Sequence, residues 1–360
     1  MTRRERLRRC YCYEELDRPA VYSRTGFPAD DPTYDRLRAL LGEQTELKGG
    51  WSSAAVQPPP PAETRVEPHS ADWDRHVAVL HTPAGELTST FLASRRGQPG
   101  LHETFLIDGP EDAQRYLSLP PQPVGGDVAG FFAADRAMGD AGIVEVSLGF
   151  NPAGFVAELC GSVTFALLSI SHRDLLHALC RRHMESLLAR VEYLQGRGVG
   201  PYFSMLGEEY VVPPLHGPAD FHDFNVRYDR PVIERIHRGG GRIHIHSHGS
   251  IRQVFQGFLD MGADVLHPIE PPPLGNITAA QAKEMARDRL CLEGNLQIHR
   301  MYEASPEGIR AEVQALIGAA FDDRRGLIVC PSASPYIRGQ GETCFPMYQA
   351  MVETVLAWKG

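Results

Sequence analysis

The stretch RIHIHSHGSIRQVFQGFLDMGADVLHPIE, residues 242–270, contains one complete strand–helix–strand unit. Residues 242–249 alternate apolar and polar side chains, which indicates a strand. Residues 250–262 have apolar side chains at helical spacing and end in glycine, and residues 264–270 form a second strand-like run. Because a helix of this length joins parallel strands of one sheet, the unit predicts an α/β fold.

The same rhythm extends from residue 143 to the end of the chain. We expect strands at 143–150, 201–206, 242–249, 264–270, 290–296 and 327–333, and helices at 171–198, 219–241, 250–262, 276–287, 305–321 and 346–360. Five strand–helix units in the second half and three in the first predict a (β/α)8 TIM barrel. An open doubly wound sheet is the alternative, but no G-x-G-x-x-G motif follows a strand here.

The first half carries additions to this barrel. We expect an N-terminal helical extension at 3–16 and a strand at 18–26. The polyproline run at 57–63 cannot join the interior of a sheet, and residues 76–93 predict a hairpin around Thr82–Gly85. We therefore interpret residues 1–360 as one TIM-barrel domain that is decorated between about 50 and 140.

Composition narrows the class of protein. The 360-residue chain has 42% hydrophobic residues and a formal charge of −9, which is typical of a globular enzyme and argues against a nucleic-acid partner. No apolar stretch is expected to approach the ~20 residues that span a bilayer, and no apolar segment follows the basic N-terminus. Seven scattered cysteines do not form a disulfide framework, so we expect a cytoplasmic protein.

Polar side chains collect where the late strands end. Glu208 and Tyr210 follow the strand at 201–206, Glu270 follows the run DVLH, Asn295 follows LCLEG, and Cys330 follows LIV. Since active sites of barrels lie at the carboxyl ends of the strands, these residues predict one site. We expect Glu208 and Glu270 to be catalytic, and Tyr210, Asn295 and Cys330 to contact a small-molecule substrate.

Alternation places His244, His246 and His248 on one side of their strand. His244 lies deepest, where a barrel interior is packed, whereas His246 and His248 lie nearest the mouth. With Glu270 as third ligand, and Glu208 or Cys330 as alternatives, the pair suits zinc or another divalent metal. Without a metal, the two imidazoles would act as a proton donor and an anion anchor.

Several of these segments resemble the uroporphyrinogen decarboxylase superfamily. The matching parts are His246–Gly249, the segment from Gly262 to Pro271, Gly294-Asn295, and the opening ERLRRCYCYEELDRPAVYSRTG at 5–26. The resemblance covers most of the chain and is weakest at 50–140. It implies a (β/α)8 barrel.

The resemblance implies two chemistries. Decarboxylases of the family use neither metal nor cofactor and bind tetrapyrrole carboxylates through arginines, of which only Arg24 has a counterpart here. Corrinoid-linked methyltransferases hold zinc through a His-x-Cys pair and a later cysteine. Here His246 matches the histidine, His248 replaces the first cysteine, and Ala333 falls on the later one.

We therefore expect a methyltransferase that moves a methyl group between a corrinoid-binding partner protein and a small acceptor, with Arg24 among the substrate contacts. A cofactor-independent decarboxylase is the alternative, and a non-catalytic binding barrel is a third hypothesis. The sequence is compatible with a homodimer and does not determine the oligomeric state.

Overall fold

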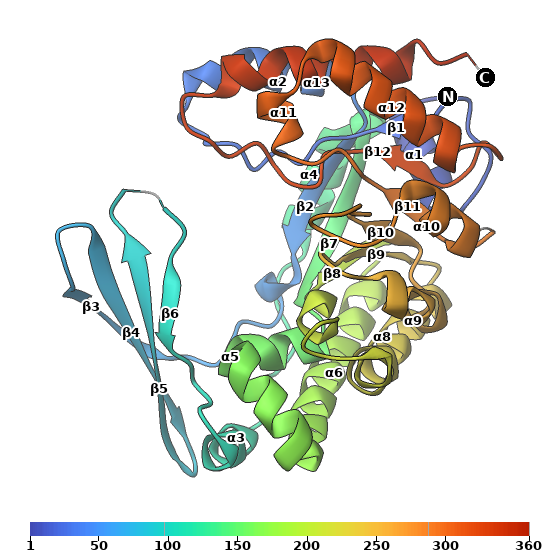
Figure 1. Cartoon of the computed structure of the whole chain (residues 1–360). Coiled ribbons are helices and arrows are strands. Elements are labelled where there is room, and N and C mark those ends of the chain that lie inside the picture. The colour runs from blue at the N-terminus through green and yellow to red at the C-terminus, as the bar shows by residue number, and fades with distance from the viewer. Residues whose placement is uncertain (97, 287, 360) are drawn as a thin grey trace.

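The computed structural model describes residues 1–96, 98–286 and 288–359. Its centre is a curled sheet of eight parallel strands in the order β1-β12-β11-β10-β9-β8-β7-β2 (Figure 1). The strands span Ala20–Val21 (β1), Leu47–Ser52 (β2), Gly142–Phe150 (β7), Tyr202–Leu206 (β8), Arg242–His246 (β9), Val265–His267 (β10), Cys291–Glu293 (β11) and Leu327–Val329 (β12). Each strand after β2 pairs with its predecessor in the sheet, as a succession of strand–helix units requires.

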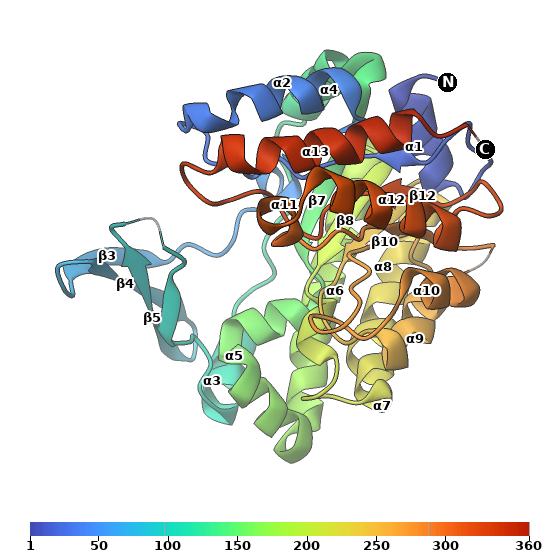
Figure 2. The ribbon, with the colours of Figure 1, turned by 45° about the horizontal axis from the view of Figure 1, so that its top comes forward.

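Helices cover the outside of this sheet (Figure 2). They span Arg3–Tyr11 (α1), Asp35–Gln44 (α2), Pro110–Leu117 (α3), Ala129–Met138 (α4), Pro152–Ser171 (α5), Arg173–Gly196 (α6), Pro218–Asp220 (α7), Arg227–Arg238 (α8), Phe255–Met261 (α9), Ala279–Ala286 (α10), Arg300–Glu303 (α11), Pro306–Ala320 (α12) and Gly341–Leu356 (α13). Helix α6 packs on α8, α8 on α9, α9 on α10, α10 on α12, and α12 on α13, which packs on α2. The main apolar core lies between this layer and the sheet.

The number and order of strands agree with the expected TIM barrel, but the closed ring is not established. Among the described residues no strand ladder joins the two edge strands β1 and β2. One backbone hydrogen bond crosses there, from Glu46 N to Val21 O at 3.0 Å, and the Glu46 carboxylate accepts a bond from Val21 N at 2.6 Å. The structure therefore supports an α/β fold with a barrel-like sheet.

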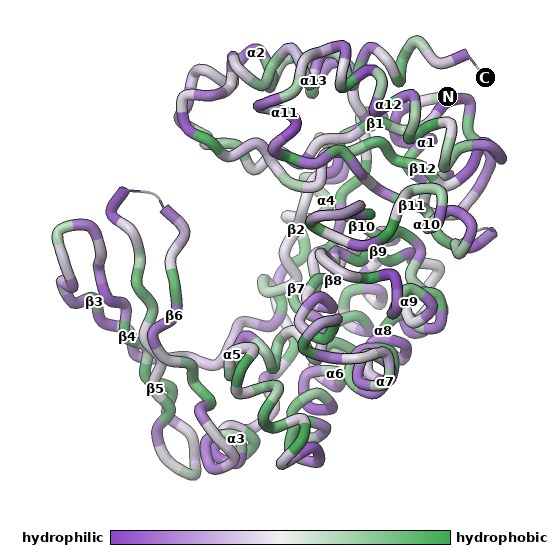
Figure 3. The backbone as a smooth tube through the Cα atoms, in the orientation of Figure 1, coloured by the Kyte–Doolittle hydropathy of each residue, from purple (hydrophilic) through white to green (hydrophobic). Residues whose placement is uncertain are grey.

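The decoration is larger than the expected hairpin. Strands β4 (Trp73–Thr82) and β5 (Gly85–Ser94) form that hairpin, and β3 (Glu63–Pro68) and β6 (Leu101–Thr104) extend it to a four-stranded antiparallel sheet. This sheet stands away from the barrel in Figure 1, and hydrophilic and apolar segments mix along it in Figure 3. Its base joins a second apolar core, in which Leu80 and Leu87 lie with residues of α3, α5 and α6.

Helix α5 corrects the expectation that no apolar stretch of the chain approaches the ~20 residues that span a bilayer. An 18-residue window of this 20-residue helix has a mean hydropathy of 1.7, so the helix is long and apolar enough to cross a membrane by length and composition alone. However, 56% of that window is buried inside the protein, and the helix packs on α6 and on the short 3-10 helix Glu208–Val211 (η4). This packing is that of a core helix.

Two glycines allow α5 to approach the end of β8. A Cβ atom on Gly154 would lie 2.7 Å from the Cα atom of Gly207, and Gly207 itself has a φ of 113°. Side chains at these positions would clash with backbone, so glycine is required. The contact fixes where η4 leaves the sheet.

Several predicted elements are longer than the observed ones. Strand β10 ends at His267 because Pro268 has no N–H to donate to a sheet, whereas we predicted a strand to 270. Only the second part of the predicted helix 219–241 is α8, because a π-helical turn at Phe221–Val226 (η5) precedes it. Positions 287 and 360 of two predicted helices lie outside the described residues.

Candidate active site

The histidines of β9 lie beside a histidine of β10. In the parallel register, His246 of β9 is the partner of His267 of β10, so the two side chains extend from the same side of the sheet. Their rings stack with centroids 5.0 Å apart, and their Nδ1 atoms are 2.9 Å apart. His244 lies one pleat deeper, with its ring centroid 6.1 Å from that of His267.

The hydrogen bonds around this pair leave Nδ1 of His267 as an acceptor. His267 Nε2 lies 3.2 Å from the carbonyl oxygen of Pro331, which can only accept, so Nε2 carries the proton and Nδ1 does not. Arg24 Nη1 lies 2.9 Å from His246 Nδ1 and 3.4 Å from its Nε2, which places the guanidinium over the face of the ring. His246 Nδ1 can therefore donate to Nδ1 of His267, or the two nitrogens can both face a metal ion when the proton of His246 is on Nε2.

Burial opposes the charged, doubly protonated form of these histidines. Desolvation and, for His246, the nearby charge of Arg24 lower the pKa of His246 to about 2. Burial likewise lowers the pKa of His244 to about 3 and holds that of His267 well below its ordinary value. The three rings are therefore neutral near pH 7, which is the form that binds a metal.

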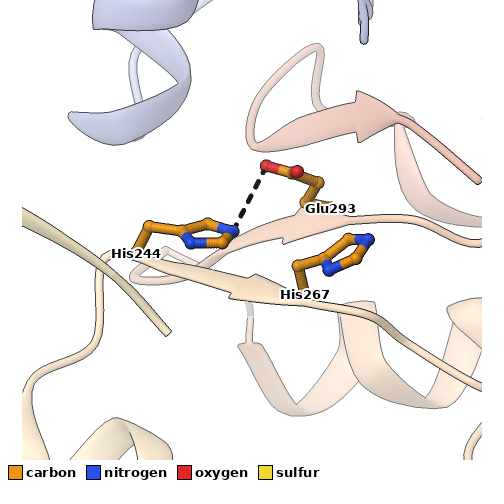
Figure 4. Close-up of side chains that lie close together, drawn as sticks. All are labelled: His244, His267 and Glu293. Atoms are coloured by element: carbon orange, nitrogen blue, oxygen red, sulfur yellow. Dashed lines mark ion pairs between the residues drawn. The ribbon is translucent and has the colours of Figure 1, made fainter. Parts of the chain in front are cut away.

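One group of the described residues has donor atoms close enough to share a metal ion. His244, His267 and Glu293 come from β9, β10 and β11, and their donor atoms lie within 4.8 Å of one another (Figure 4). His244 Nε2 lies 3.6 Å from Glu293 Oε2 and is buried with no hydrogen-bond partner among the described residues. An orphaned imidazole nitrogen, a second imidazole and a carboxylate form a donor set that fits zinc.

A second pair lies nearer solvent. His248 Nδ1 is 3.2 Å from Glu270 Oε2, which also accepts a bond from Gly249 N at 3.0 Å. Burial raises the pKa of Glu270, but these two hydrogen bonds outweigh it and the net shift is downward. The ionised carboxylate makes His248 Nδ1 the donor, so Nε2 is left as a base, and the side chain is 40% exposed.

The structure separates two predicted residues from the histidines. Glu208 is fully buried, its carboxylate has no hydrogen-bond partner among the described residues, and Asn225 of η5 donates to its backbone carbonyl. Burial, with the nearby charge of Asp229, holds the pKa of Glu208 well above its usual range. Tyr210 donates to Glu158 of α5.

The other predicted residues lie at or near the cluster. Arg24 contacts His246 directly, and Cys330 Sγ lies 3.9 Å from His267 Nε2. Burial holds the pKa of the Cys330 thiol well above its ordinary value, so it is not a free thiolate. Asn295 is half-buried just beyond the end of β11.

Sequence reasoning missed His267, Glu293 and Lys48. Lys48 of β2 is buried, contacts Glu293, and lies 3.6 Å from Glu145 Oε1, to which Tyr11 of α1 donates. A series of polar contacts thus runs from Tyr11 of α1 through Glu145, Lys48 and Glu293 to His244. His267 could have been found, because it ends a strand one unit after His246; a lysine in LKGGW carries no such signal.

Comparison with known proteins decides the family. A family model for uroporphyrinogen decarboxylase matches residues 156–355, which is more than half of the chain. The chain belongs to the uroporphyrinogen decarboxylase family. The match begins in α5 and includes β8 to β12 and therefore the histidine cluster.

One solved structure agrees with this chain at the level of the fold. A methyltransferase from Methanosarcina mazei superposes with a TM-score of 0.62 at 15% identity, over 98% of each chain. A B12-independent methionine synthase from Shewanella sp. W3-18-1 matches with a TM-score of 0.45 at 11% identity, over 66% of this chain and 70% of that one. No curated protein sequence matches the chain significantly.

Proposed function

We propose that this family member is a methyltransferase that moves a methyl group between a corrinoid carried by a partner protein and a small acceptor. The observation that carries the proposal is the unpartnered nitrogen of His244, whose donor atom lies within 4.8 Å of donor atoms of His267 and Glu293. The fold shared with a methyltransferase over nearly the whole chain supports it. The mildly acidic chain and the single matching arginine, Arg24, are less suited to a tetrapyrrole carboxylate substrate.

His244, His267 and Glu293, with His246, are the residues that we propose to hold a zinc ion. Bound there, zinc would supply Lewis-acid activation of a thiol or hydroxyl acceptor. Lys48 lies against Glu293 and forms an ion pair with its carboxylate. The sequence-based set His246, His248 and Glu270 is the competing proposal and shares His246 with this one.

In this proposal, His248 and Glu270 handle the proton of the acceptor. Glu270 orients the His248 ring through Nδ1, and the exposed Nε2 takes the proton as the acceptor loses it. Arg24 binds an anionic part of the acceptor or keeps His246 in place. A partly exposed base above a buried cluster matches an acceptor that enters from solvent.

Demethylation of free methylcobalamin tests the proposal. The purified protein is mixed with methylcobalamin and a panel of small thiols, and the loss of the methylcobalamin absorption is followed. We expect demethylation by the wild type and none by His246→Ala. Coproporphyrinogen formation from uroporphyrinogen, without any demethylation, would overturn the proposal in favour of the decarboxylase.

A further inference from the structure

A cavity lies away from the histidine cluster. It has a volume of about 420 Å³ and lies between α6, the carboxyl ends of β2 and β7, and the proline-rich segment 57–60. None of the residues that line it belongs to the histidine cluster. Its size is within the range of small-molecule sites, and its walls include Leu148, Phe155 and Leu179.

The cavity contains one buried guanidinium. Arg190 lines it and is 8% exposed. Its Nε donates to Gln57 Oε1 at 3.0 Å, and its Nη1 donates to Ser53 Oγ at 3.0 Å and to Leu148 O at 3.2 Å. Within residues 1–96, 98–286 and 288–359, Nη2 has no hydrogen-bond partner and no carboxylate pairs with the guanidinium.

An unpaired buried charge is costly, and neighbouring groups do not neutralise it. Burial lowers the pKa of Arg190 to about 10, so it remains a cation near pH 7. His183 also lines the cavity, and burial followed by the charge of Arg190 lowers its pKa to about 3, so it is neutral. Arg182 and Glu185 line the cavity with opposite charges, so the net charge that remains is that of Arg190.

We propose that this cavity, the Arg190 pocket, binds a small apolar molecule that carries one carboxylate. The carboxylate pairs with Nη2 of Arg190, and the apolar body contacts the Leu148, Phe155 and Leu179 side of the pocket. Gln57, whose Nε2 donates to Gln122 O at 3.0 Å, holds the guanidinium in a fixed orientation. One fixed positive charge among apolar walls matches one negative charge, and a phosphate dianion would need more donors.

Calorimetric titration of the full-length protein tests the pocket. The probes are phenylacetate and its neutral counterpart phenylacetamide, which differ in the charge that Arg190 would recognise. We expect phenylacetate to bind at least about tenfold more tightly than the amide, and Arg190→Met to remove that preference. Arg197→Gln, an exposed arginine at the end of the same helix, is the matched control and should bind as the wild type does.

Because Arg190→Met removes three hydrogen bonds, a second variant guards against misfolding. Ala189 is exposed and lines the pocket, so Ala189→Trp fills the space without removing any bond of Arg190. We expect this variant to melt like the wild type and to lose phenylacetate binding. Equal affinity for the acid and the amide, no binding of the acid by the wild type, or unchanged binding by Ala189→Trp would each overturn the proposal.

Discussion

The buried neutral histidines should make the stability of the metal-free protein depend on pH. His244 has a pKa of about 3 in the folded chain, against about 6.5 for an unperturbed histidine. Between these values the unfolded state binds a proton that the folded state does not. The free energy of unfolding therefore falls as pH drops below about 6.5, and it is constant with respect to this group above that pH.

The size of the effect follows from linkage. One such histidine costs about 1.4 kcal/mol per pH unit in this window, or about 2 kcal/mol between pH 7 and pH 5. If His246 and His267 behave alike, the three together cost about 6 kcal/mol, which is much of the 5–15 kcal/mol that stabilises a typical domain. Other groups titrate too, so the useful quantity is the difference between the wild type and a histidine variant.

Urea unfolding of chelator-treated protein at pH 5, 6 and 7 measures this difference. Relative to the wild type, His244→Gln should lose about 2 kcal/mol less stability between pH 7 and pH 5. His172→Gln, at an exposed histidine, is the control and should follow the wild type. An identical pH dependence of the free energy of unfolding for His244→Gln and the wild type would refute the claim that His244 is neutral in the folded protein.

Two further outcomes are expected. Glu270→Gln removes the anion that orients His248, so the methyl-transfer rate should fall by about 10²–10⁴-fold in a methylcobalamin demethylation assay. Metal analysis should show an unchanged metal content. A rate within threefold of the wild type (about 0.7 kcal/mol) would contradict the role of Glu270. Gly154→Val adds a Cβ atom 2.7 Å from the Cα atom of Gly207. The free energy of unfolding should therefore fall by about 1–3 kcal/mol in a denaturant titration. An unchanged midpoint would show that α5 can move away from β8.

The sequence predicted the architecture because its signals there are local. The alternation at 242–249 and the helical spacing at 250–262 depend on neighbours in the chain, and both elements are found as β9 and α9. Strand ends were less predictable, since Pro268 ends β10 earlier than hydropathy suggests. Helix α5 was not predicted, because its apolar residues lie on all sides of the helix and so give little helical periodicity.

The site was predictable only in part, because it depends on register between strands. His246, Arg24 and Cys330 lie at or next to the cluster, and His248 and Glu270 contact each other as their spacing suggested. Glu208 was predicted to be catalytic from its place after a strand, but its buried carboxylate makes no hydrogen bond among the described residues. Lys48 of β2 contacts Glu293 of β11, which is far from it in the sequence, and no local pattern encodes that contact.

The metal content of the purified protein tests the central claim most directly. After incubation with zinc and removal of the free ion, we expect about one zinc per wild-type chain, and the same for His248→Ala. His267→Ala and His244→Ala should bind no zinc while they remain folded by circular dichroism. No bound zinc in the folded wild type, or loss of zinc in His248→Ala with retention in His267→Ala, would contradict the account.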